Sequence, residues 1–277
     1  MRFAKTSHGK IFYTVKGEGM TVVLIRGLGR WSTHWCGWDE ALAQHCKVIT
    51  FDNKGLGLTT SPMRPWHTLS DLANDVAVVL RQERIDSAHI VGTSLGGMVS
   101  LVFALRHPEL TKSISVIGAS VGRSGHPRIS ASAARMLIRA PLLRDALYDE
   151  LAGLLTSPKT SQEVRQKLAR EWRLEDAKHK QPIVTVISQL IAVLRFRKWE
   201  DLAKIKSAAQ IIVGKDDLFV PRGNSLFLHS QMPTSQLIEL ECAGHEPHVD
   251  QPEAMTKLIL NFIKHHNHPP GSSKNNG

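Results

Sequence analysis

The chain has 277 residues, of which 42% are hydrophobic and 22% charged, and this balance excludes a disordered or fibrous protein. Its longest strongly apolar runs, such as residues 21–25 and 258–263, are much shorter than the ~20 residues that cross a bilayer, so we expect no membrane span. The net charge of +10 raises the question of an acidic partner, although no nucleic-acid-binding module accompanies it and we expect no nucleic acid.

Short β-type runs alternate with amphipathic stretches from residue 10 onward, which predicts a largely parallel sheet covered by helices. We expect strands at residues 10–15, 21–25, 47–51, 88–91, 113–118, 210–213 and 237–241, and helices at residues 69–84, 98–107 and 252–265. The strands are almost continuously apolar, which suits burial on both faces of the sheet.

The alternation stops between residues 121 and 199, where four helical patterns follow one another. We expect this insertion to be a lid over the carboxyl ends of the strands, where open α/β sheets bind ligands. The predicted organisation is a core over 1–120 and 200–264, a helical lid over 121–199, and a disordered polar tail over 265–277. The lid segment holds 15 Lys or Arg against 7 Asp or Glu, so it carries most of the positive charge.

The segment Val91-Gly92-Thr93-Ser94-Leu95-Gly96 contains the strongest chemical signal of the sequence. It has the G-x-S-x-G pattern of a nucleophile elbow, and it stands between a predicted strand and a predicted helix, as that motif requires. Small residues on both sides of Ser94 allow the strand and the helix to approach closely. We therefore predict that Ser94 is a nucleophile.

A serine hydroxyl becomes a good nucleophile when a histidine takes its proton and a carboxylate orients that histidine. In this architecture the acid and then the histidine follow later strands. One such segment contains Asp216 and Asp217, and the next contains His245 and His248. Metal binding by these histidines is not expected, because Pro247 opposes the helix that a zinc-protease pattern needs.

From residue 10 to 264 the sequence resembles the α/β-hydrolase superfamily, in particular its esterases and 3-oxoadipate enol-lactonases. This resemblance implies an α/β-hydrolase fold with a mostly parallel eight-stranded sheet flanked by helices. It selects Asp217 as the acid, in a G-x-x-D-x-x-x-P segment, and His245 as the base, in an A-G-H-x-P segment. His248 is then the alternative base.

The negative charge that develops on a substrate carbonyl needs two backbone N–H donors held in place beforehand. Leu95 supplies one, since it follows Ser94 at a helix N-terminus. The resemblance implies that Leu28, in the loop Arg26-Gly27-Leu28-Gly29, supplies the other. Relatives usually have His where this chain has Arg26. Arg26 either bridges the loop through hydrogen bonds or reaches an anionic substrate group.

A serine at the elbow argues against dehalogenase and epoxide hydrolase chemistry, which need a carboxylate there. We expect a cytoplasmic serine hydrolase of carboxylic esters that works through an acyl-enzyme, without cofactor or metal. Lactonase, thioesterase, carbon–carbon bond hydrolase and acyl-carrier-protein methyl ester esterase stay open, the last because Arg135 and Arg139 share a face of the basic lid. A non-catalytic scaffold is least favoured, since all three catalytic positions are filled, and the oligomeric state is not indicated.

Overall fold

The computed structural model describes residues 1–120, 127–143, 146–179, 182–197, 199–233 and 235–267. Residues 121–126 of the predicted lid and residues 268–277 of the predicted tail therefore lie outside the described residues. In the part of the chain that is described, no helix is both long and apolar enough to cross a membrane.

The sheet has eight strands in the order β1-β2-β4-β3-β5-β6-β7-β8. β1 pairs antiparallel with β2, and β2 pairs antiparallel with β4. All the other neighbouring strands of the sheet pair in parallel. This confirms the predicted fold class. The strands are β1 (Arg2–Thr6), β2 (Gly9–Lys16), β3 (Thr21–Ile25), β4 (Lys47–Phe51), β5 (Ala88–Thr93), β6 (Thr111–Ile117), β7 (Ala208–Gly214) and β8 (Ser235–Leu240).

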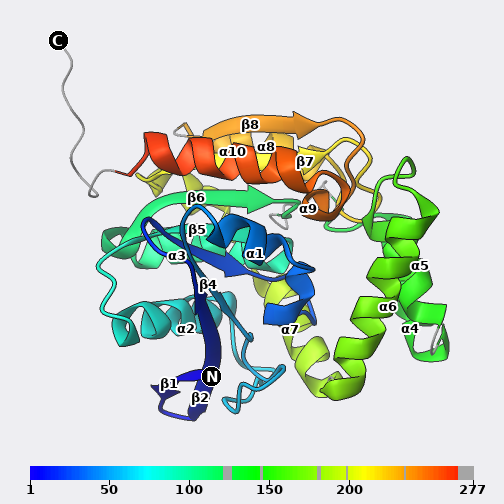
Figure 1. Ribbon diagram of the computed structural model, residues 1–277, viewed down its shortest axis with the longest axis horizontal. Coiled ribbons are helices and arrows are strands. Elements are labelled where there is room, and N and C mark those ends of the chain that lie inside the picture. The colour runs from blue at the N-terminus through cyan, green and yellow to red at the C-terminus, as the bar shows by residue number, and fades with distance from the viewer. Residues whose placement is uncertain (121–126, 144–145, 180–181, 198, 234, 268–277) are drawn as a thin grey trace.

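Helices cover both faces of the sheet, because alternate strand side chains point to opposite faces and the central strands bury apolar side chains on both. One face packs against α2 (Leu69–Gln82), α3 (Leu95–Arg106) and α8 (Gly223–Gln231). The other face packs against α1 (Trp38–Ala43) and α10 (Pro252–His265). Two large apolar clusters result, one on each side of the sheet. The sheet and the helices on its two faces can be followed in Figure 1.

Four helices interrupt the strand series between β6 and β7, and we call them the helical insertion. They are α4 (Ala131–Leu143), α5 (Ala146–Leu155), α6 (Gln162–Lys178) and α7 (Ile183–Arg195). Figure 1 shows α4, α5 and α6 beyond the arrowheads of the strands. A separate apolar cluster between α5 and α6, which includes Leu168 and Trp172, stabilises these two helices against each other. The insertion therefore lies at the carboxyl ends of the strands.

Candidate active site

Ser94 stands in the sharp turn between β5 and α3, with φ 57° and ψ −119°. A residue other than glycine rarely adopts a positive φ, and such backbone strain persists only where the surroundings enforce it. Here the Ser94 N–H donates to the Ile117 carbonyl of β6 at 2.7 Å. A Cβ on Gly92 would collide with the backbone of Gly96, and one on Gly96 would collide with the carbonyl of Ile25. Glycine at both positions is what lets the turn form.

His245 and Asp217 are joined by a hydrogen bond of 2.8 Å between Nδ1 and Oδ2. Both side chains are buried, at 3% and 1% exposure. The other Asp217 oxygen accepts the N–H groups of Phe219 and Val220, each at 2.8 Å, so the carboxylate cannot turn away. Burial opposes the charged ring, but Asp217 outweighs this effect and raises the pKa of His245. The pair is built to hold an oriented imidazole that accepts a proton.

Ser94 and His245 line the same cavity, although no hydrogen bond joins them in the described part of the structure. Catalytic hydrogen bonds are often long before substrate binds. Gly118, with φ 54°, leaves room for the histidine and the aspartate, because a Cβ at this position would lie 3.0 Å from His245 Nδ1 and 3.3 Å from Asp217 Oδ2. The predicted nucleophile, base and acid are thus brought together at one edge of the sheet.

The two predicted oxyanion donors flank the nucleophile. Leu95 is the first residue of α3, so its N–H has no carbonyl one turn earlier to bind. The loop that holds Leu28 passes close to Ser94, since a Cβ on Gly27 would lie 3.2 Å from Ser94 Cβ. The next N–H, of Gly29, donates to Gln189 Oε1 of α7 at 2.9 Å, which fastens this oxyanion loop to the helical insertion.

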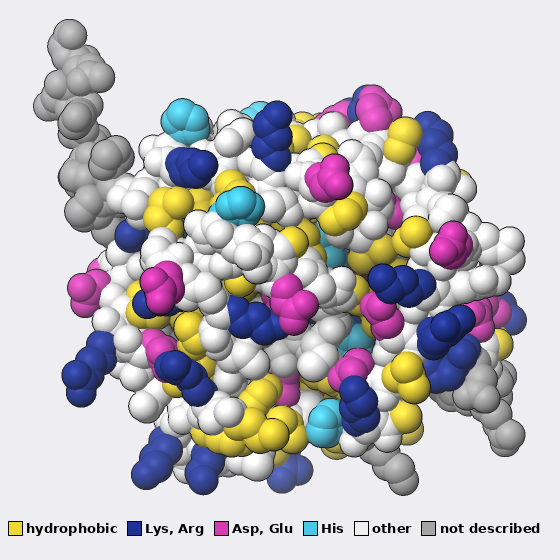
Figure 2. Space-filling model, viewed as in Figure 1, with side chains coloured by type: hydrophobic (Ala, Val, Ile, Leu, Met, Phe, Trp, Pro, Cys, Tyr) yellow, Lys and Arg dark blue, Asp and Glu magenta, His cyan; other side chains and the backbone are white. Residues whose placement is uncertain are grey.

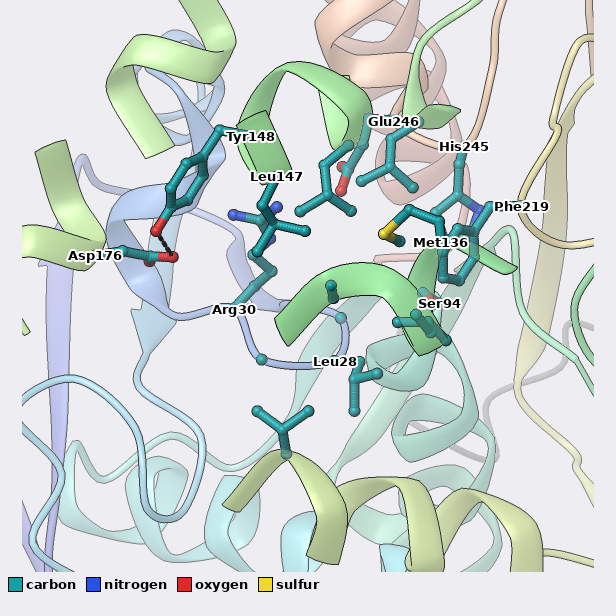
Figure 3. Close-up of a pocket in the computed structure, with 17 residues that line it drawn as sticks. Leu28, Arg30, Ser94, Met136, Leu147, Tyr148, Asp176, Phe219, His245 and Glu246 are labelled. Carbon is teal, nitrogen blue, oxygen red and sulfur yellow. Dashed lines mark hydrogen bonds between the residues drawn. The ribbon is translucent and has the colours of Figure 1, made fainter. Parts of the chain in front are cut away.

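The cavity above Ser94 measures about 160 Å³ and is mostly apolar. Its upper wall comes from the insertion, whose lining residues include Met136, Leu137, Leu147, Leu151 and Leu155 (Figure 3). Three charged groups also line it, namely Arg30, Asp176 and Glu246. Reasoning from the sequence singled out none of these three, because nothing in their local sequence shows that they face a common space.

Arg26 does not reach this cavity, which argues against its predicted alternative role in binding an anionic substrate group. Its guanidinium is 1% exposed and binds both oxygens of Glu246, at 2.9 and 3.0 Å. It also stacks on Trp35, with 4.5 Å from its central carbon to the ring. Burial raises the pKa of Glu246, yet Arg26, with contributions from His248 and His245, outweighs burial and brings the pKa to about 2. The pair ties the oxyanion loop to the loop that holds His245.

The alternative acid and base have other partners. Asp216 accepts a hydrogen bond from Ser157 at 2.5 Å, whereas the carboxylate that binds His245 is that of Asp217. His248 packs between Trp35 and Trp38, at 5.1 and 5.3 Å between ring centres, and contacts Arg26 at 3.3 Å. Burial is the main cause that lowers the pKa of His248 to about 3, which keeps its ring neutral. Neither residue lines the cavity with Ser94.

Known proteins are similar to this chain over nearly its full length. A candidate carbamate hydrolase named RutD, from Agrobacterium fabrum, is 27% identical over 260 residues, which span 92% of this chain and 97% of that protein. An esterase from Exiguobacterium antarcticum superposes with a TM-score of 0.82 at 20% identity, over 95% and 98% of the two chains. An enol-lactonase from Burkholderia xenovorans has a TM-score of 0.78 at 22% identity, over 95% and 100%.

The two superpositions show the shared fold alone, because their sequence identities are low. The sequence profile of the alpha/beta hydrolase fold, by contrast, matches residues 21–252 and so covers most of the chain, from β3 to the start of α10. The chain belongs to the alpha/beta hydrolase family, and hydrolytic activity follows from that membership.

Proposed function

We propose that the protein is a serine hydrolase that cleaves a small carboxylic ester through an acyl-enzyme. The observation that carries the proposal is the arrangement around one cavity: Ser94 on its strained turn, and His245 held by Asp217 at 2.8 Å. A scaffold that only bound a ligand would have no need to strain a serine backbone beside a histidine that an aspartate holds in a fixed orientation.

In this mechanism Ser94 Oγ attacks the ester carbonyl carbon while His245 Nε2 takes its proton. Asp217 holds the opposite ring nitrogen and stabilises the imidazolium that forms. The N–H groups of Leu28 and Leu95 stabilise the oxyanion. His245 then protonates the leaving alcohol, and an acyl-enzyme remains. Water attacks the acyl-enzyme with His245 as base, which releases the acid and restores Ser94.

The cavity size supports a small substrate. A cavity of roughly 150 Å³ in another protein holds one benzene molecule, and the volume here is about 160 Å³. A short ester fits this space better than a long acyl chain on a carrier protein. Arg139 of the insertion contacts Glu150 at 3.3 Å, and Figure 2 shows basic and acidic side chains interspersed over the visible face rather than one continuous basic surface.

A small carbamate is the second candidate substrate. The full-length similarity to candidate carbamate hydrolases favours it, and a carbamate carbonyl would be attacked by the same groups. A carbamoyl-enzyme, however, generally reacts with water more slowly than an acyl-enzyme. A burst of product followed by slow turnover on p-nitrophenyl carbamates, with fast turnover on the matched esters, would separate the two candidates.

The direct test is labelling with a fluorophosphonate, followed by location of the adduct. We expect the adduct on Ser94, none in Ser94→Ala, and hydrolysis of p-nitrophenyl acetate and butyrate that falls steeply with longer acyl chains. Ser100, which donates to the Gly96 carbonyl within α3, offers a matched control, and Ser100→Ala should keep the labelling. Unlabelled Ser94 in folded protein would refute the proposed function.

A further inference from the structure

Arg30 brings a positive charge into the cavity from the same loop that carries an oxyanion donor. Its N–H closes a turn onto the Gly27 carbonyl at 3.2 Å, which places it directly after the oxyanion loop. Figure 3 shows the side chain reaching from this loop toward Leu147 of the insertion. The residue is only 9% exposed, and what remains exposed faces the space that it shares with Ser94 and His245.

The Arg30 guanidinium lies over the face of an aromatic ring. Its central carbon is 3.9 Å from the ring centre of Trp172, a buried residue of α6. Such stacking stabilises the cation through the ring face, but it leaves the N–H groups along the edge of the guanidinium without acceptors. The contact with Trp172 restrains the guanidinium beside the cavity, so its free N–H groups are available to a planar ligand there.

No described carboxylate binds this edge directly. Glu246 uses both oxygens on Arg26. Asp176 accepts a hydrogen bond from Tyr148 at 3.0 Å and faces His34 Nε2 at 3.3 Å. Both acids act on Arg30 only from a distance, and burial, which is the larger effect, lowers the pKa of Arg30. Among the described residues, the Arg30 side chain has neither an ion-pair partner nor a hydrogen-bond acceptor.

We propose that Arg30 binds a carboxylate of the substrate, so that the enzyme selects small esters that carry a carboxylate at one end. This inference rests on the proposed function and adds the substrate class to it. A carboxylate matches the free guanidinium edge through two parallel hydrogen bonds. The apolar walls around Ser94 then hold the short hydrocarbon chain between the anchored end and the ester carbonyl.

The test compares anionic esters with neutral esters of the same shape. Monomethyl succinate and monomethyl glutarate place the carboxylate on the acyl side, and 3-acetoxypropanoate places it on the alcohol side. In the neutral partners an isopropyl group replaces the carboxylate. We expect kcat/KM of the wild type to favour one of the two anionic types by 10- to 100-fold, since a charge-assisted hydrogen bond contributes about 1.5–3 kcal/mol. The favoured type identifies the side on which the carboxylate lies.

Substitution of Arg30 should remove this preference without removing catalysis. Arg30→Met should lower kcat/KM for the favoured anionic ester 10- to 100-fold and leave its neutral partner within about threefold, and Arg30→Lys should restore part of the loss. Arg135→Met removes an equal charge from an exposed position of α4 and should change neither ester. Thermal unfolding of each variant would separate loss of binding from loss of structure.

A binding measurement makes the outcome independent of turnover. Titration calorimetry of Ser94→Ala with monomethyl glutarate and 3-acetoxypropanoate should show binding of one of them, and the Ser94→Ala/Arg30→Met variant should bind it at least tenfold more weakly. The role of Arg30 would be overturned if the wild type had equal kcat/KM for anionic and neutral esters, or if the double variant bound the anionic ester with unchanged affinity. Absence of fluorophosphonate labelling at Ser94 would instead refute the proposed function and leave the calorimetric result standing.

Discussion

Replacement of Arg26 by methionine tests the buried ion pair between the oxyanion loop and the histidine loop. Methionine fills part of the Arg26 volume but leaves Glu246 as a buried carboxylate without its cation. Burial raises the pKa of Glu246, whereas Arg26, as the main opposing group, together with His248 and His245 brings it from 4.5 down to about 2. At about 1.4 kcal/mol per pKa unit, that difference corresponds to roughly 3 kcal/mol of folding stability at pH 7. Removal of one partner of a buried ion pair typically lowers folding stability by about 3–5 kcal/mol, and the value derived from the pKa of Glu246 lies at the lower end of that range.

The assay is urea unfolding of wild type and Arg26→Met between pH 7 and pH 4.5. In the wild type, the contribution of Glu246 is complete above pH 4.5 and is lost as the pH falls from 4.5 to about 2. In Arg26→Met, burial remains the largest effect on Glu246 and is opposed only by the weaker influence of His248 and His245, so its pKa rises and the folded state takes up a proton as the pH falls from neutrality. The stability difference between the two proteins should therefore shrink toward pH 4.5.

A double variant provides the control. Arg26→Met/Glu246→Gln has no buried charge at this position and should recover most of the stability that Arg26→Met loses. The reasoning would be refuted if Arg26→Met cost less than about 1 kcal/mol at pH 7, or if its cost stayed constant down to pH 4.5. The wild-type and variant m-values should agree, so that the midpoints can be compared as free energies.

Three further predictions concern the catalytic groups. Asp217→Asn should lower kcat on p-nitrophenyl acetate about 10⁴-fold, and Asp216→Asn should keep most activity, because only Asp217 contacts the histidine; equal losses would contradict this. Gly118→Ala should lower kcat by up to about 10²-fold, since its Cβ would lie 3.0 Å from His245 Nδ1, whereas Gly19→Ala, also at positive φ but with open space around it, should stay active. The acid limb of kcat/KM against pH should have an apparent pKa above 6.5, because protonated His245 cannot accept a proton; a limb below 6.5 would show that Asp217 does not raise the pKa of His245.

Much of the core could be predicted because its strands are short apolar runs between clear turns. The predicted bounds of β3, β4 and α10 match the structure, and those of most other elements differ by a few residues. β1 could not be predicted, because only Ala4 of this edge strand is buried and its apolar alternation is therefore weak. Its pairing with β2 is what adds the eighth strand to the sheet.

The catalytic positions could be predicted because each follows a strand within a short local motif. The charged groups of the cavity could not, because their roles depend on contacts between distant segments. Arg26 and Glu246 are 220 residues apart in sequence, and Arg30 contacts Trp172, a residue of the distant helix α6. Local periodicity contains no information about such pairs. The same limit explains why the sequence suggests Arg26, and not Arg30, as a group that could bind an anionic ligand.

The helical insertion also contacts the histidine loop so closely that it is not an exchangeable module. The Glu246 N–H donates to the Leu155 carbonyl at the end of α5, and Asp250 accepts the N–H groups of both Gly244 and Ser157. In a chimera that exchanges the insertion for that of another hydrolase, the Glu246 N–H and the Asp250 carboxylate would lose their hydrogen-bond partners in the insertion. Engineering of new specificity by grafting must therefore transfer the 155–160 turn together with residues 244–250, or else confine its changes to side chains within the cavity.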